Sequence, residues 1–128
     1  MSYYFSKILP SPFEEVVQHT IETLKLEGFG IITQIDVKET LRVKLNQEFR
    51  PYRILGACIP GLAYEALKLE DKIGTMLPCN VIVQDAGSGN TEVAAIDPVA
   101  SMQAVANPQL LEKAKLVREK LKRVIDAL

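Results

Sequence analysis

The feature that most constrains the fold is a pair of long amphipathic helical patterns, one near each end of the 128-residue chain. The first begins at Ser11-Pro12, where we expect Ser11 to cap the helix and Pro12 to occupy its first position, and it ends at Gly28. The second follows Asn107-Pro108 and carries one apolar stripe, formed by Leu110, Ala114, Val117, Leu121, Val124 and Leu128. Two such helices can pack on one face of a sheet, which predicts a layered α+β domain.

Strand patterns occupy much of the remaining sequence. We expect strands at residues 3–9, 29–35, 51–59, 77–85 and 91–96, with residues 86–90 as a hairpin loop. A short helix is expected after Asp36, which pairs with Glu39 at the helix start, and it should end near Asn46. A second short helix follows Pro60-Gly61, and Asp97-Pro98 has the form of a further helix start. Without linkers or repeats, residues 1–128 are predicted to form a single domain with a mainly antiparallel sheet.

The reverse face of this sheet is expected to be apolar. In the second strand, alternation predicts Phe29, Ile31 and Ile35 on one face and Ile32 and Gln34 on the other. If Phe29, Ile31, Val81, Val83, Val93 and Ala95 face the helices, the reverse face carries Ile32, Ile82, Ala94 and Ile96. Water is a poor neighbour for so many apolar groups. A partner subunit, the short helices or a ligand should therefore cover them.

Composition excludes several classes of protein. Fifteen basic and sixteen acidic residues give a net charge of −1, which argues against a nucleic-acid-binding role. No apolar run approaches the roughly 20 residues that span a bilayer, and the N-terminus does not have the pattern of a signal peptide. Two cysteines outside a C-x-x-C pair fit a reduced, cytoplasmic setting.

The two cysteines, Cys58 and Cys79, fall near a strand end and a strand beginning. If these strands are neighbours, the thiols could form a dithiol switch or contact a soft metal. The alternative is that both are small buried hydrophobes, as cysteines commonly are. The sole histidine, His19, is expected to point to solvent, so the sequence gives little support for a zinc site.

Polar residues gather near the strand ends. Arg50 and Tyr52 should share one face and could hold an anion, with Arg53 on the other face. The alternative is that these arginines pair with carboxylates at the rim of the sheet. Asn80 lies in an apolar strand start and could clip the adjacent loop or orient a ligand.

No catalytic set is recognisable in the sequence. Asp36 and Asp97 could do acid–base chemistry if they meet, but each is favoured as a helix cap. Gly87-Ser88-Gly89 precedes a strand and not a helix, so it fails as a phosphate loop. There is also no histidine-based nucleophile arrangement. We predict no catalytic residue, no metal and no cofactor.

Four segments together resemble the domain of unknown function 302 (DUF302) family: Gly28-Phe29-Gly30-Ile31, Phe49 to Cys58, Leu77-Pro78-Cys79-Asn80-Val81 and Asp97-Pro98. The resemblance covers essentially the whole chain. It implies an α+β fold like that of the TATA-box-binding protein, in the order strand, helix, four strands, helix, often as a dimer. It implies no DNA binding, because only topology is shared. Family members often carry Asn after the first cysteine, where this chain has Ile59.

The resemblance places any shared site at Arg50, Tyr52, Cys58, Cys79, Asn80 and Asp97, without assigning an activity. The leading hypothesis is a non-catalytic cytoplasmic homodimer that binds a small anionic or amphipathic ligand near Arg50, Tyr52 and Asn80. The alternatives are a thiol-based redox or metal-handling protein that uses Cys58 and Cys79, and an enzyme that uses Asp36 or Asp97. We expect no nucleic-acid or membrane partner.

Overall fold

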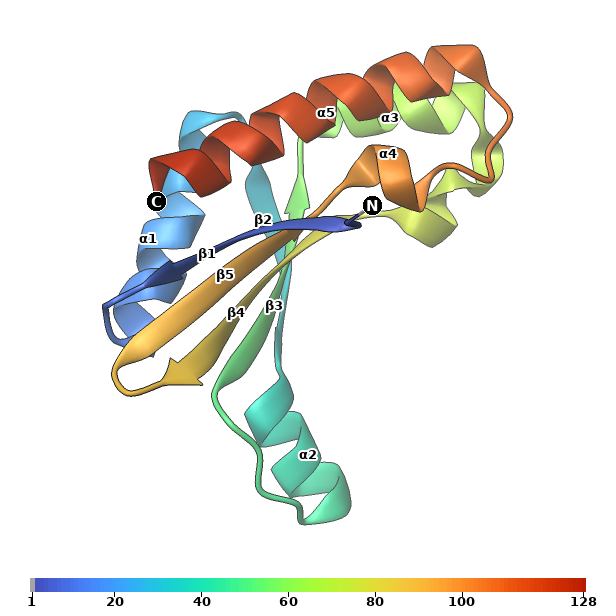
Figure 1. Cartoon of the computed structure of the whole chain (residues 1–128). Helices are drawn as coiled ribbons and strands as arrows, with labels where there is room; N and C mark the ends of the chain where they lie inside the picture. The colour runs from blue at the N-terminus through green and yellow to red at the C-terminus, as the bar shows by residue number, and fades with distance from the viewer. Residues whose placement is uncertain (1) are drawn as a thin grey trace.

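The computed structural model describes residues 2–128, so Met1, the first residue of the predicted domain, lies outside the described residues. The elements, shown in Figure 1, are β1 (Tyr4–Leu9), α1 (Phe13–Leu26), β2 (Gly30–Asp36), α2 (Val37–Leu45), β3 (Tyr52–Cys58), α3 (Pro60–Leu69), the 3-10 helix η1 (Asp71–Met76), β4 (Cys79–Gly87), β5 (Asn90–Ile96), α4 (Pro98–Ser101) and α5 (Pro108–Ala127). The predicted order of strand, helix, four strands and helix, with short inserted helices, is confirmed.

The strands form one open sheet in the order β1-β5-β4-β3-β2, and every neighbouring pair is antiparallel. β1 and β2 are therefore the two edges. The hairpin between β4 and β5 turns at Gly87, Ser88 and Gly89, all with positive φ, which is the conformation that such tight connections require. The α+β prediction is confirmed.

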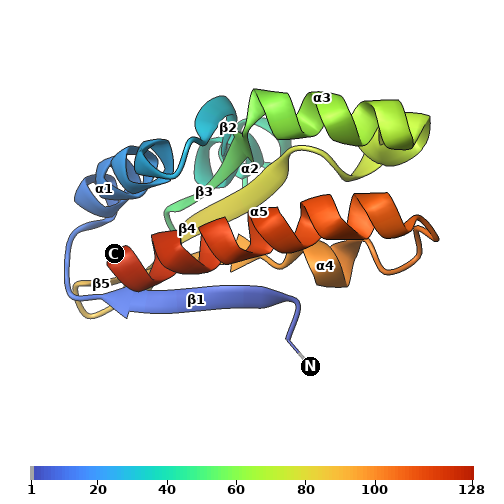
Figure 2. The same cartoon turned by 90° about the horizontal axis from the view of Figure 1, so that it is seen from above.

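The two long helices, α1 and α5, pack on the same face of the sheet, as predicted (Figure 2). Their fully buried side chains include Val17 and Leu24 from α1 and Leu121 and Val124 from α5. These contact a layer of strand residues that is also buried, formed by Leu55, Ala57, Val81, Val83, Val93 and Ala95. Burial of each large aliphatic side chain contributes about 1.5–3 kcal/mol. This interface is therefore the main hydrophobic core of the domain.

Most helix boundaries follow the predicted caps. The Asp36 carboxylate accepts a hydrogen bond from the Glu39 amide at 3.0 Å, and α2 ends at Asn46, whose φ of 53° is left-handed. The Asn107 side chain accepts from the amides of Gln109 and Leu110, both at 3.1 Å. These side chains satisfy amides that a helix start would otherwise leave unpaired.

The start of α1 differs from the prediction. The helix begins at Phe13, Pro12 stands at the cap position, and no side chain caps the helix. Ser11 instead offers its carbonyl oxygen to the Thr91 hydroxyl, which donates at 2.8 Å. This bond holds the connection between β1 and α1 against β5, so tertiary contact replaces the local cap at this helix start.

The second strand departs from simple alternation. A bulge lies between Ile31 and Thr33, so the register shifts there. Ile31 pairs with Ala57 on the helix-covered face, whereas Ile35 pairs with Ile54 on the opposite face. Gln34 pairs with Leu55 on the helix-covered face. The predictions that Ile31 and Ile35 share a face and that Gln34 lies on the reverse face are therefore wrong, because the extra residue in the bulge changes the parity of the strand.

Helix α2 lies between the end of β2 and the start of β3 and extends from the body of the domain (Figure 1). None of its nine residues is buried, and the side chains of Val43 and Leu45 are 66% and 63% exposed. A short helix gains most of its stability from packing of its apolar face. Within residues 2–128, Val37 and Leu41 are half-buried, whereas nothing covers Val43 and Leu45.

None of the helices in the described part of the chain combines the length and apolar character that crossing a membrane requires.

Candidate functional site

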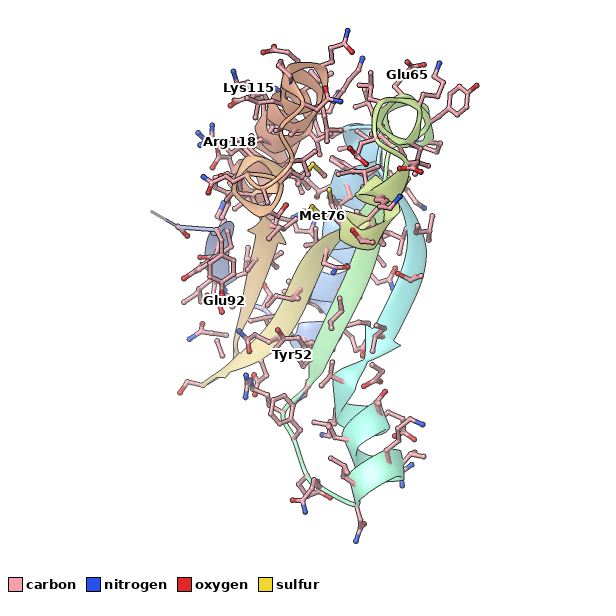
Figure 3. All side chains as sticks on the ribbon, turned by 90° about the vertical axis from the view of Figure 1, so that its right-hand side faces the viewer. Tyr52, Glu65, Met76, Glu92, Lys115 and Arg118 are labelled. Carbon is pink, nitrogen blue, oxygen red and sulfur yellow. The ribbon has the colours of Figure 1, made fainter. Side chains whose placement is uncertain are left out.

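The face of the sheet opposite α1 and α5, here called the open face, carries a row of apolar residues between more polar rows. Across the strands, Ile35 pairs with Ile54, Ile54 with Ile82, and Ile82 with Ala94. A neighbouring row runs from Tyr52 through Gln84 to Glu92. Figure 3 looks onto this face and shows Tyr52 toward its lower end and Glu92 toward the β1 side.

A groove of about 360 Å³ lies on the open face. It is lined by Tyr3, Tyr4, Tyr52, Asn80, Ile82, Gln84, Glu92, Ala94, Ala95 and Ile96. The predicted reverse-face residues Ile82, Ala94 and Ile96 are therefore confirmed there, and Ile32 is exposed at the bulge of β2. Among residues 2–128, the short helices do not line this groove. Its mixture of aromatic, aliphatic and amide groups is typical of a small-molecule site.

Arg50 stands beside this groove, held by three neighbours. Its Nε donates to the Gln84 side-chain oxygen at 2.9 Å, and its guanidinium lies 4.4 Å from the ring centre of Phe49 and 5.6 Å from that of Tyr52. Gln84 in turn donates to Glu92 at 2.8 Å. Cation–π contacts and the amide bond fix the orientation of the arginine, yet no carboxylate within residues 2–128 forms an ion pair with it.

Arg53 behaves differently from Arg50. Its guanidinium pairs with Glu14 at 3.0 Å and with Asp36 at 3.7 Å, and it lies 5.5 Å from the ring centre of Phe13. The prediction that Arg53 turns away from Arg50 and Tyr52 is confirmed. For Arg53 the carboxylate-pairing alternative is correct, and for Arg50 it is not.

Asn80 lies on the open face, opposite Gly56 of β3. Its side chain is exposed and not buried in the apolar strand start, so it does not need an internal partner to offset desolvation. It lines the groove together with Tyr52. The structure thus brings Arg50, Tyr52 and Asn80 to one face.

Cys58 and Cys79 lie in a different place, in a mainly apolar cavity beyond the sheet end between α3 and α5. Cys79 pairs across the strands with Ala57, the residue next to Cys58, so the two strands are neighbours, which is the condition on which the dithiol hypothesis depends. Both are free thiols. Burial raises the pKa of Cys58, and burial together with the nearby Cys58 raises the pKa of Cys79 to about 11.

A raised pKa leaves little thiolate at neutral pH, and the thiolate is the reactive form. The thiol hypothesis stays a prediction, and this environment works against it. The described residues hold no group of three or more His, Cys, Asp or Glu side chains suited to a metal ion, and His19 is exposed on α1, as predicted.

Asp97 lies apart from both the open-face residues and the two cysteines. It is buried at the start of α4, where its carboxylate accepts from the Val99 amide at 3.0 Å and from Arg118 at 3.2 Å. Asp36 lies at the end of the edge strand β2. The strands β4 and β3 separate β2 from β5, the strand that precedes Asp97. The structure does not bring Asp36 and Asp97 together, so an acid–base pair formed by these two residues is excluded.

The six predicted site residues therefore fall into three groups: Arg50, Tyr52 and Asn80 at the open face, Cys58 and Cys79 in the cavity, and Asp97 at a helix start. Sequence reasoning missed Phe49, Gln84 and Glu92, which hold Arg50 in place or line the groove. The sequence does carry a signal for Gln84 and Glu92, because they alternate with buried valines in the same way as Ile82. It indicates one shared face once the pairing register of β4 and β5 is known.

Comparisons with known proteins identify relatives without an assigned role. The family model described as "Domain of unknown function DUF302" matches residues 5–128. A crystal structure of an uncharacterised conserved DUF302 protein from Bacillus stearothermophilus has a TM-score of 0.89 and 28% sequence identity, with 98% of each chain covered. The comparison with curated proteins gave no match.

Proposed function

The chain belongs to the DUF302 family, whose function is unknown, and on that premise we propose that it is a non-catalytic binding domain. Its open-face groove holds a small anionic or amphipathic ligand, and the domain acts as a homodimer. The acidic head of the ligand meets Arg50, and its apolar part lies on the row formed by Ile82, Ala94 and Ile96. Asn80 orients the ligand by hydrogen bonding.

The observation that carries this proposal is the state of Arg50. A guanidinium has five N–H donors in a planar fork that matches carboxylate, sulfonate and phosphate groups. The Nε of Arg50 is used by Gln84, while the two aromatic rings beside it fix the plane. The terminal nitrogens have no carboxylate partner in residues 2–128. A pre-oriented arginine of this kind binds an anion with little loss of side-chain entropy.

The composition of the groove supports an amphipathic ligand over a fully polar one. Tyr4 and Tyr52 provide flat apolar surfaces with hydroxyl tips, and Ile82, Ala94 and Ile96 are only half-buried. Glu92 adds a negative charge at the β5 side. The charge pattern therefore favours a ligand with its anionic group at Arg50 and its neutral end away from it.

The test uses 8-anilinonaphthalene-1-sulfonate, an amphipathic anion whose fluorescence rises on binding. The Arg50→Ala variant should weaken its affinity about tenfold or more, because a charge-assisted hydrogen bond contributes about 1.5–3 kcal/mol. Asn80→Ala should weaken it less. Arg42→Ala is the matched control, since Arg42 is exposed on α2 and already paired with Glu39. Unchanged affinity in both Arg50→Ala and Asn80→Ala would remove the basis of the proposal.

The proposed homodimer forms through α2 and the edge strand β2. Only Ile31 among the seven residues of β2 is not exposed, and Ile32 and Ile35 add to the apolar surface of Val43 and Leu45. Asp36, at its end, is the one charged residue of this edge strand, and no further strand within residues 2–128 pairs with its outer side. Such an edge readily pairs with a second strand, and a two-fold axis would bring the same edge of a second copy against it.

Light scattering coupled to size-exclusion chromatography tests the dimer. The double variant Val43→Glu/Leu45→Glu should be monomeric at concentrations where the parent protein is dimeric. Leu116→Glu, on the exposed side of α5, is the control and should stay dimeric. A monomeric parent protein at tens of micromolar would contradict the dimer while leaving the ligand proposal intact.

A further inference from the structure

A second hollow of the molecule, here called the α3–α5 cavity, shares no lining residue with the open-face groove. Its volume is about 50 Å³. It is lined by residues of α3, α4 and α5, by the ends of β3 and β4, and by Phe29, and it is partly open to solvent. Figure 3 shows sulfur atoms in the region between α5 and α3, where this cavity lies.

The cavity exists because small side chains meet where α3 faces α5. Ala63 and Ala66 of α3 lie toward Ala114 of α5, with Cys58 and Cys79 at the strand ends. Protein interiors are normally packed without such voids, since wall atoms that lack neighbours lose dispersion energy. A leucine in place of one of these alanines would fill the space. The sequence therefore keeps small residues, and with them an unfilled space, at a position where a larger side chain would give normal packing.

The chemistry of the walls restricts what can occupy this room. Fifteen of the sixteen lining residues are uncharged, and all but Lys113 are apolar or cysteine. Apolar walls of this kind favour small apolar groups over water. Because about 10–15 Å³ of such space suffices for one water molecule, the α3–α5 cavity has room for a short run of methylene groups.

Lys113 supplies the charge at this site. It is half-buried along the cavity wall, and a lysine in this position packs its methylene stem against apolar neighbours while its ammonium reaches water. Its neighbours on α5 have carboxylate partners: Lys115 pairs with Glu112 and Arg118 with Asp97. Lys113 forms no ion pair with any residue from 2 to 128.

We propose that the α3–α5 cavity is a binding site for a short linear fatty acid. The end of the alkyl chain enters the cavity between Ala66 and Ala114, and the carboxylate pairs with the Lys113 ammonium. The site is separate from the open-face groove and does not rest on the function proposed for that groove.

Isothermal titration calorimetry with octanoate tests the charged part of the site. Lys113→Met keeps the stem and removes the charge, so octanoate should bind about tenfold more weakly than to the parent protein. Lys115→Met is the matched control on the same helix and should bind as the parent does. Equal affinity in the parent and both variants, or no octanoate binding to the parent, would overturn the proposal.

A filled cavity tests the apolar part. In the Arg50→Ala background, which removes the proposed anion site of the open-face groove, Ala66→Leu should abolish octanoate binding, whereas Ala127→Leu, exposed near the end of α5, should leave it unchanged. Octanoate binding that persists in a folded Ala66→Leu variant of this background contradicts the proposal. If circular dichroism shows Ala66→Leu to be unfolded, the comparison of Lys113→Met with Lys115→Met decides the question.

The open-face variant Arg50→Ala separates the two sites. It should keep an octanoate site that still depends on Lys113, even where it loses 8-anilinonaphthalene-1-sulfonate. Loss of octanoate binding in Arg50→Ala, with Lys113→Met unaffected, would place the fatty acid in the groove and overturn the cavity site.

Discussion

Gly56 marks the tightest point of the central sheet, and its replacement by alanine should destabilise the protein. The residue lies in β3, between Thr33 of β2 and Asn80 of β4. A Cβ atom built at Gly56 would stand 2.1 Å from the Thr33 Oγ1 and 2.8 Å from the Pro78 Cγ. Both distances are well below van der Waals contact, so neighbouring atoms must move.

The two neighbours can yield to different extents. Thr33 belongs to the exposed edge strand β2, so its hydroxyl can rotate away at small cost. Pro78 has a rigid ring directly before β4, and its displacement requires movement of the backbone. Overpacking of this kind typically costs 1–3 kcal/mol, and the lower unfolded-state entropy of alanine offsets about 0.4–1 kcal/mol. We therefore expect Gly56→Ala to lower the free energy of unfolding by about 1–2 kcal/mol.

Urea denaturation followed by circular dichroism measures this change, with a lower midpoint and an unchanged m value. Gly61→Ala is the matched control, because a Cβ at Gly61 in α3 meets no atom within 4 Å, and it should be neutral or stabilising. In a Thr33→Ala background the cost of Gly56→Ala should shrink but not vanish, since Pro78 still obstructs. A Gly56→Ala variant as stable as Gly61→Ala would refute the close approach of Thr33 and Pro78.

Three further predictions concern stability. Asp97→Ala should lower the free energy of unfolding by about 1–2 kcal/mol, because the Val99 amide and Arg118 both lose their acceptor; Asp97→Asn should lose less in the same urea assay, and equal losses would contradict the capping role. Asn107→Ala should cost about 1 kcal/mol through two unpaired helix-start amides, whereas Asn107→Asp should nearly preserve stability, and a neutral alanine variant would count against this cap. The pKa of Cys79 is raised to about 11 in the folded protein, so the folded state holds the thiol proton to a higher pH than the unfolded state. The contribution of this thiol to the free energy of unfolding is therefore complete below the unfolded pKa, and it is lost as pH rises from about 9 to about 11. We expect native protein to be alkylated slowly at pH 8. We also expect the free energy of unfolding to fall more steeply over this pH range in the parent protein than in Cys79→Ala.

The local parts of the fold could be predicted from the sequence. The cap at Asp36 and the left-handed Asn46 define α2 because each acts through bonds within a few residues. The same holds for Asn107 at the start of α5. Ser11 has an equally good local pattern, but its carbonyl accepts a bond from Thr91 of β5. A contact across 80 residues leaves no trace in the local sequence.

The candidate site could be predicted only in part, because it depends on register. Alternation along β3 correctly separates Arg53 from Arg50 and Tyr52. It cannot show that Gln84 of β4 lies opposite Tyr52 and holds Arg50, since that pairing is fixed by the sheet as a whole. The bulge that moves Ile35 to the open face also adds one residue without a sequence signal.

The open face yields the most direct test, because three of the four tyrosines, Tyr3, Tyr4 and Tyr52, line its groove. The fourth, Tyr64, is 61% exposed on α3 and serves as an internal control. Hydroxyl-radical footprinting should be run with and without saturating 8-anilinonaphthalene-1-sulfonate. We predict that the probe protects Tyr4 and Tyr52 and leaves the oxidation of Tyr64 unchanged. Equal oxidation of Tyr52 with and without bound probe would contradict binding at the open face.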